Sequence, residues 1–150
     1  MLRLFTYGMF VVGVSDGQDA NVFTANWLTQ VSFDPPMVAV SVENDTRSKR
    51  LIDASGRFAV SVLAVGQRQI AADLGRSSGQ SPKKLEGVGH RFAANGCPVL
   101  EDALGYVACE VRGSVPAGDS TVYVGEVVEA ASFRGGEPLT MKDAGFRHFG

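Results

Sequence analysis

The chain has 150 residues, a length that favours one domain, 1–150, with a single hydrophobic core. Hydrophobic residues make up 45% of it, charged residues 20%, and the formal net charge is -2. This balance is typical of globular proteins, and because no basic stripe or arginine-rich arm is present to neutralise phosphates, it argues against a nucleic-acid partner.

The sequence also argues against a membrane protein and a metalloprotein. No apolar run is long enough to span a bilayer, so we expect a cytoplasmic protein with no membrane partner. Cys97 and Cys109 are too few for a disulfide framework, and no Cys or His stands near them at metal-ligand spacing. We therefore expect two reduced thiols and no metal site.

Short strands bounded by turn residues dominate the first part of the chain. Phe10–Ser15 is rich in β-branched and aromatic residues and runs into Asp16-Gly17, a pair suited to a hairpin turn. Asn21–Thr24 is the expected return strand. In Met37–Glu43 the valines alternate with smaller residues, which predicts a half-buried central strand with the valines on one face.

Two short helices are predicted next, with a strand between them. The stretch from Asn44 to Gly56 offers several N-cap residues and a terminating glycine, so a helix should begin near Ser48. Alternation across residues 58–62 predicts a strand, and a second helical segment covers about Gln67 to Leu74.

The second half is predicted to hold an exposed loop and a long hairpin. Arg76 to His90 is rich in Gly, Ser and Lys, which favours an exposed loop over a core element. Tyr106–Val115 and Ser120–Phe133 are two long β-type runs that form a hairpin around the turn residues between them. The tail from Arg134 to Gly150 has weak periodicity and is not assigned.

These elements together favour a mainly β fold. Many short strands with turns, few helices and no strict βαβ alternation favour an antiparallel barrel over a doubly wound sheet. No G-x-G-x-x-G sequence opens a helix, which argues against a Rossmann domain.

Polar and small residues surround the only tryptophan. The segment Thr24-Ala25-Asn26-Trp27 can present amides to a flat heteroaromatic ligand, with the indole as an apolar wall. It also fits a bulged strand whose tryptophan fills the core, and the residues alone favour that alternative.

Two cationic segments are candidates for binding an anion. Arg47, Ser48 and Lys49 stand at a predicted helix start, where free N–H groups, a hydroxyl and cations make a phosphate cradle, although a solvated helix face explains them as well. Lys84, in the long loop, could reach the same anion, but an ordinary solvated lysine is the simpler explanation. His90 and His148 have no companions of the kind a triad or metal site needs, so they are interpreted as surface or structural residues.

The order of these segments resembles the flavin reductase-like family of FMN-binding split barrels over most of the chain, from about Tyr7 to about Glu129. The matching pieces are Tyr7-Gly8-Met9-Phe10-Val11-Val12, Thr24-Ala25-Asn26-Trp27, Val31 to Pro36, Val38 to Val42, Ser48 with Leu51-Ile52, Ser55 to Leu63, Lys84-Leu85-Glu86-Gly87-Val88, and Gly118-Asp119 leading to Gly125-Glu126-Val127. The resemblance is greatest to flavoredoxins and to flavin-reductase domains joined to rubredoxin-type modules.

The resemblance implies a Greek-key antiparallel barrel with a few short helices, working as a homodimer with the flavin at the interface. The flavin would be FMN, with FAD as the alternative, and NADH or NADPH would be the electron donor. The isoalloxazine ring would lie beside Thr24, Ala25, Asn26 and Trp27. The phosphate would lie against Arg47, Ser48 and Lys49, with Lys84 closing the site. No catalytic residue is assigned, because the flavin carries the redox chemistry.

Three functions are compatible with this resemblance. The first is an NAD(P)H-dependent flavin reductase that passes electrons to free flavin, a monooxygenase or another redox protein. The second is a flavoredoxin-like electron carrier with little nicotinamide activity, favoured by Ser120 where many relatives have histidine. The third is a flavin-binding module without turnover.

Overall fold

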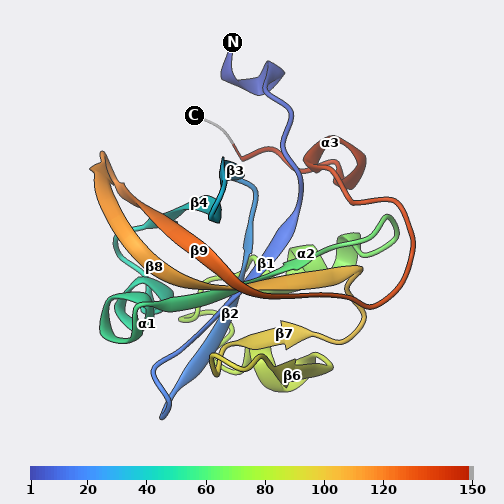
Figure 1. The fold of residues 1–150 in the computed structure, drawn as a ribbon. Helices are drawn as coiled ribbons and strands as arrows, with labels where there is room; N and C mark the ends of the chain where they lie inside the picture. Colours follow the sequence, from blue (N-terminus) through green and yellow to red (C-terminus); the bar gives the residue numbers. More distant parts are fainter. Residues whose placement is uncertain (149–150) are drawn as a thin grey trace.

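The computed structural model describes residues 1–148 and consists mainly of β-strands (Figure 1). The strands are β1 (Phe10–Ser15), β2 (Ala20–Ala25), β3 (Leu28–Phe33), β4 (Pro36–Glu43), β5 (Arg57–Val62), β6 (His90–Phe92), β7 (Pro98–Leu100), β8 (Gly105–Ala117) and β9 (Ser120–Ser132). The helices are α1 (Arg47–Ser55), α2 (Arg68–Leu74) and α3 (Met141–Ala144), with 3-10 turns η1 (Leu2–Leu4) and η2 (Lys84–Gly87). Within this part of the chain, each helix is too short to cross a membrane.

One antiparallel sheet dominates the architecture. Its seven strands follow the order β2-β1-β5-β8-β9-β4-β3, and β6 and β7 form a separate pair. Hairpins join β1 to β2, β3 to β4 and β8 to β9, while β1 pairs with β5 and β4 pairs with β9 across long sequence separations. This arrangement confirms the predicted mainly β, antiparallel class.

Local sequence explains the ends of α1. The side chain of Thr46 accepts a hydrogen bond from the backbone N–H of Lys49 at 3.2 Å, and Gly56 ends the helix with a φ of 67° that favours glycine. The predicted helix near Ser48 and its terminating glycine are therefore confirmed. The helix packs against β1, β2 and β4.

The core lies on both faces of the central strands. Val12, Val40 and Phe58 belong to a cluster inside the curved sheet, and Val11 and Leu63 belong to a second one on the opposite face, under α2 and α3. The predicted valine face of β4 is confirmed, because the alternate valines of this strand all pack in the cluster that contains Val12, Val40 and Phe58. Packing on both faces explains why β1 reads as a nearly continuous apolar run.

Both cysteines belong to this interior. Cys97 and Cys109 are free and fully buried. Burial raises the pKa of the Cys97 thiol to about 11 and that of Cys109 to about 12, so both are protonated at neutral pH.

Two expectations from the sequence are wrong in part. The return strand does not end at Thr24, because β2 continues to Ala25, and the unpredicted strand β3 begins at Leu28. The loop from Arg76 to His90 is not exposed throughout, since η2 lies within it and Leu85 and Val88 pack on the core. In both cases tertiary contacts outweighed local composition.

The close approach of β1 to Pro98 gives a test of the packing. A Cβ on Gly13 would overlap the main-chain oxygen of Pro98, whereas one on Gly113 meets no atom within 4 Å. We expect Gly13→Ala to lower the free energy of unfolding by about 3 kcal/mol or more. The matched change Gly113→Ala should cost less than about 0.5 kcal/mol. Urea unfolding of both variants checks this, and equal midpoints would contradict the packing described.

Candidate functional site

A cavity of about 740 Å³ opens between one end of the sheet, where α1 and α2 lie, and the C-terminal tail. Its walls come from β2, the Asn26-Trp27 connection, β4, the start of α1, the end of α2, residues 75–80 of the long loop, and the tail. A cavity of this volume lies in the range of small-molecule and cofactor sites.

The structure brings most of the residues predicted from the sequence into this cavity. Those that line it are Thr24, Ala25, Asn26, Trp27, Arg47, Ser48 and Lys84. Lys49 is not among the residues that line it. The predicted ring-binding and phosphate-binding groups therefore face one common space, except for Lys49.

Ser48 stands at the second position of α1 and is held in place by β2. Its Oγ accepts a hydrogen bond from the Asn21 side-chain amide at 2.9 Å, and the same amide donates to Ser78 Oγ at 3.1 Å. Both Asn21 and Ser48 are buried. One amide thus joins a strand, a helix start and the long loop at the polar end of the cavity.

Arg47 extends from the same helix start towards that loop. Its guanidinium forms an ion pair with Asp19, with Nε 3.0 Å from Oδ2, and donates to the main-chain oxygen of Pro82 at 3.4 Å. The side chain is 28% exposed. These contacts fix the guanidinium at the rim of the cavity.

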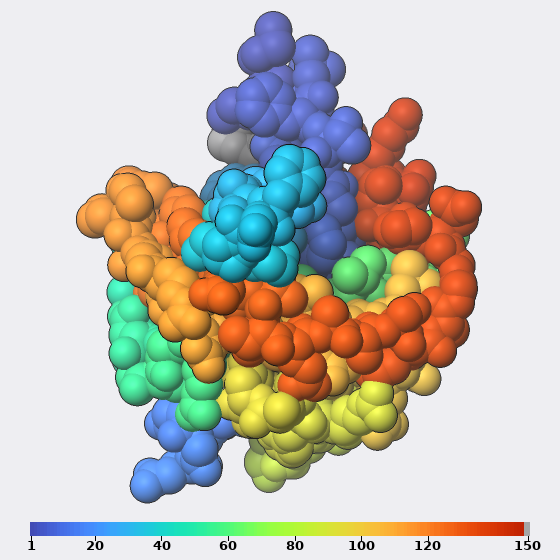
Figure 2. All heavy atoms as spheres, in the orientation of Figure 1, coloured from blue at the N-terminus to red at the C-terminus, as the bar shows by residue number. Residues whose placement is uncertain are grey.

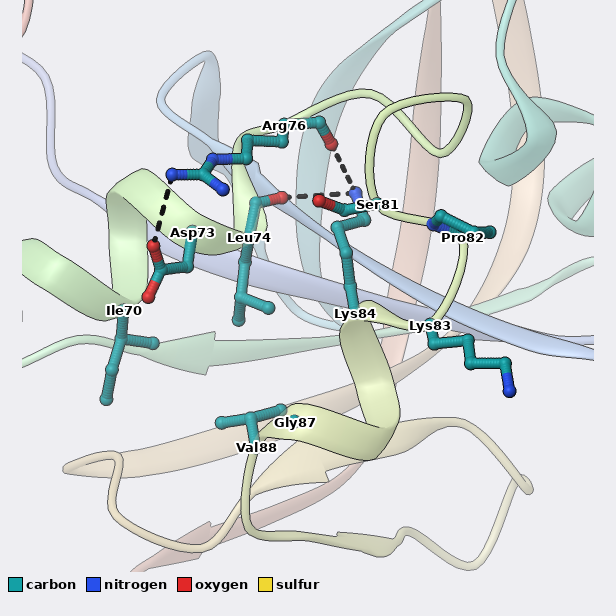
Figure 3. A pocket seen from close by; sticks show the side chains of 10 residues that line it. All are labelled: Ile70, Asp73, Leu74, Arg76, Ser81, Pro82, Lys83, Lys84, Gly87 and Val88. Atoms are coloured by element: carbon teal, nitrogen blue, oxygen red, sulfur yellow. Dashed lines mark hydrogen bonds and ion pairs between the residues drawn. The ribbon is translucent and has the colours of Figure 1, made fainter.

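Lys84 is the buried cation of the site. The residue is 8% exposed, and its ammonium group donates to the main-chain oxygens of Leu74 at 3.2 Å and Arg76 at 2.8 Å, as Figure 3 shows. Burial, and then the nearby charge of Arg47, lower the pKa of Lys84 below its ordinary value. A buried ammonium held by neutral carbonyl oxygens is well placed to receive an anion.

Lys49 lies on another side of α1. Its ammonium is 2.7 Å from Asp53 Oδ2, one turn further along the helix, and Asp53 also accepts a hydrogen bond from the Tyr123 hydroxyl at 2.5 Å. The hydrogen bond to Asp53 raises the pKa of Lys49 above its ordinary value. Helical spacing explains the difference, because neighbouring residues project about 100° apart around the helix axis.

The opposite end of the cavity is aromatic and amide-lined. Asn26 donates from its side-chain amide to Met141 Sδ at 3.2 Å and to the main-chain oxygen of His148 at 3.3 Å. The imidazole of His148 lies 5.1 Å from the Trp27 ring, and its Nε2 is 4.0 Å from Glu43 Oε1. The tail therefore crosses the aromatic end of the cavity.

Thr24 positions the second helix. Its hydroxyl donates to the main-chain oxygen of Ala71 in α2 at 2.6 Å. This contact brings the end of α2, with Gly75 and Arg76 after it, against the cavity.

Several cavity residues were missed by the sequence analysis. Among them are Asn21, residues 77–80, Met141, Phe146 and His148, the last of which was interpreted as a surface or structural residue. The guanidinium of Arg68 lies 4.8 Å from the Phe146 ring and helps to hold the tail there. Only the aromatic and basic residues of the tail could have indicated that it lines the cavity, because its periodicity is weak.

The chain is similar to known flavin-dependent proteins along its whole length. A family model described as flavin reductase like domain matches residues 1–150. An NADH-dependent flavin reductase of a Rhodococcus species is 34% identical over 149 residues, which cover 97% of this chain and 81% of that protein. A high molecular weight rubredoxin of Moorella thermoacetica is 32% identical, and the match covers 93% of this chain but 62% of that protein.

A solved structure agrees with this similarity. The NADH:FAD oxidoreductase of Streptomyces globisporus, in complex with NAD and FAD fragments, has a TM-score of 0.86 and 30% identity, and the match covers 97% of this chain and 87% of that one. The agreement confirms the predicted split β-barrel fold. From its sequence, its fold and these relatives, the chain belongs to the flavin reductase like domain family.

Proposed function

We propose that the protein is an NAD(P)H-dependent flavin reductase, an oxidoreductase that binds FMN, or alternatively FAD, in the 740 Å³ cavity. The observation that carries the proposal is the placement of a buried ammonium, a guanidinium and a helix-start hydroxyl at one end of a cavity whose other end holds Trp27 and Asn26. The family membership and the activities named for the Rhodococcus and Streptomyces relatives support it.

The residues fit a flavin phosphate in their chemistry. Lys84 and Arg47 supply positive charge, and Ser48 supplies a hydroxyl beside the free N–H groups at the start of α1. A phosphate dianion would offset the cost of burying the Lys84 ammonium. Lys49 has no part in this cradle, because it does not line the cavity.

At the other end, Trp27 and Asn26 would hold the ring. The indole gives an apolar wall, and the Asn26 amide offers hydrogen-bond donors that the tail carbonyl of His148 now accepts. The bound flavin would supply the redox chemistry, accepting a hydride from the nicotinamide and passing electrons on. The protein would orient the ring and exclude water from it.

A flavoredoxin-like electron carrier is the second candidate. Ser120 lines the cavity, so the position where many relatives have histidine presents a hydroxyl here. This hydroxyl donates a hydrogen bond to Asp119 Oδ1 at 3.0 Å. The rubredoxin name of the Moorella relative supports a redox-protein acceptor, and free flavin used by a monooxygenase is the other acceptor that we propose. Two free, buried cysteines fit the reducing cytoplasm in which we place the protein.

We also propose that the protein is a homodimer. β3 is an edge strand of the sheet, and Phe33 at its end is 91% exposed, with Val31 at 50%. The turn between β3 and β4 projects from the surface in Figure 2. An exposed apolar edge needs a cover, and a second copy of this surface would provide one beside the flavin cavity, since Trp27 directly precedes β3.

Anaerobic reduction separates the two candidate functions. Protein loaded with FMN should lose its visible absorbance within seconds of adding NADH or NADPH, because a reductase binds the nicotinamide against the flavin. A flavin that stays oxidised until dithionite is added would overturn the reductase proposal and favour the electron carrier. Protein that binds no flavin would overturn both.

The phosphate cradle can be tested with two neighbouring residues. We expect Ser48→Ala to raise the Kd for FMN about tenfold and leave riboflavin within about twofold, since a hydrogen bond to a charged group contributes roughly 1.5–3 kcal/mol. Lys49→Ala is the matched control and should change neither Kd. Fluorescence titration measures both flavins; an equal loss for FMN and riboflavin would contradict the cradle.

The dimer surface can be tested at its most exposed apolar residue. Phe33→Asp should shift the protein from dimer to monomer in light scattering at micromolar concentration, because it buries a charge in the apolar contact. Phe92→Asp is the control, as Phe92 is 57% exposed on β6, away from β3. A dimer that survives Phe33→Asp, or a wild-type monomer, would refute the proposed surface.

A further inference from the structure

The C-terminal tail is anchored by main-chain hydrogen bonds as far as α3. The N–H of Leu139 donates to the oxygen of Leu63 at 2.8 Å. The N–H of Met141 donates to the oxygen of Tyr7 at 2.9 Å, and α3 begins at that residue and ends with Gly145 as its cap. The tail up to this cap is therefore a fixed part of the fold.

The strap, residues 146–148, is held by side chains of other elements. The guanidinium of Arg68 in α2 lies 4.8 Å from the Phe146 ring and donates to the last main-chain oxygen of α3 at 2.5 Å. The chain then turns back from α3 towards β3, where the His148 imidazole meets Trp27 (Figure 1). The His148 side chain is 56% exposed. The strap thus lies over the ring-binding end of the cavity and is not packed into the core.

The side-chain amide of Asn26 limits what this end of the cavity can hold. Such an amide has two N–H donors. Asn26 donates to Met141 Sδ at 3.2 Å and to the main-chain oxygen of His148 at 3.3 Å, which occupies both. Asn26 is also buried, at 8% exposure. Because Met141 is fixed at the start of α3, a flavin ring that accepts a hydrogen bond from Asn26 must take the place of the His148 oxygen.

The aromatic contact leads to the same result. The His148 imidazole lies 5.1 Å from the Trp27 ring, with an angle of 49° between the two planes. Phe146 and His148 both line the cavity. Side chains that cover the indole leave less of it for a flat ring. The strap and the flavin ring therefore need the same apolar wall and the same hydrogen-bond donor.

We infer that the strap is a built-in competitor of the flavin: it occupies the ring-binding end when the site is free and leaves it when flavin binds. The inference rests on the proposed flavin site. Because the contacts of the strap must break before the ring can dock, they weaken flavin binding in proportion to the fraction of molecules with the strap in place. The return of the strap to Asn26 and Trp27 would help to release reduced flavin to an acceptor.

Arg68 offers a test from outside the cavity. Arg68→Ala removes the contact with Phe146 and the bond to α3, yet Arg68 does not line the flavin cavity. Arg91→Ala is the matched control, since the Arg91 guanidinium lies 4.2 Å from the Phe133 ring and neither residue lines the cavity.

We expect Arg68→Ala to bind flavin more tightly than the wild type. Its Kd should fall about threefold for FMN and equally for riboflavin, because both carry the ring with which the strap competes. His148→Ala, which uncovers Trp27 directly, should have the same effect, and Arg91→Ala should change neither Kd. Fluorescence titration measures the Kd values, and thermal unfolding verifies the fold of each variant. Looser or unchanged flavin binding in both Arg68→Ala and His148→Ala would overturn the inference.

Limited proteolysis reports the position of the strap itself. Arg147 is exposed, and trypsin can cleave after it once the backbone at His148 is released from Asn26. Saturating FMN should speed this cleavage severalfold in mass spectrometry, while cleavage after Arg3, exposed in η1, stays constant as the internal reference. Slower or unchanged cleavage after Arg147 would overturn the inference and leave the proposed function intact. Wild-type protein that binds no flavin would overturn the proposed function first.

Discussion

The buried ammonium of Lys84 constrains the whole site. A charge taken out of water is costly unless it is compensated, and the groups that hold this one are the main-chain oxygens of Leu74 and Arg76. The Leu74 oxygen is available because α2 ends at that residue and leaves its last oxygens without helical partners, and Arg76 follows directly after the helix cap. The end of a helix thus places a cation at the wall of the cavity, and the loop must fold inward to bring it there.

That inward fold is supported from the other side of the site. Asn21 joins β2 to Ser48 and to Ser78, and Arg47 joins the start of α1 to Pro82. Each link connects a rigid element to the loop through a side chain at the cavity edge. The site is therefore built on a strand and two helix ends, while the loop is ordered by contacts with them.

Local patterns predicted the parts of this structure that local physics decides. The alternation in β4, the start of α1 near Ser48 and its stop at Gly56 all depend on a few neighbouring residues, and each was predicted from the sequence. Lys84 was identified as a site residue only through family resemblance, because its burial depends on how the loop folds back onto the end of α2, ten residues earlier in the chain. Lys49 was misplaced because a short basic run does not say which cation faces inward. The periodicity of the tail was too weak to place Phe146 and His148 at the cavity.

The strand order also constrains how the chain folds as it is synthesised. β4 pairs with β3 early but finds its second partner only when β9 exists, since Glu43 pairs with Ser120, and β5 likewise waits for β8. Pairings between distant segments slow folding because a long loop must close before any contact forms. When the first half of the chain leaves the ribosome, β4 and β5, both mostly apolar, therefore each have one edge without a partner strand. We expect the nascent chain to depend on chaperones until nearly all of it has emerged.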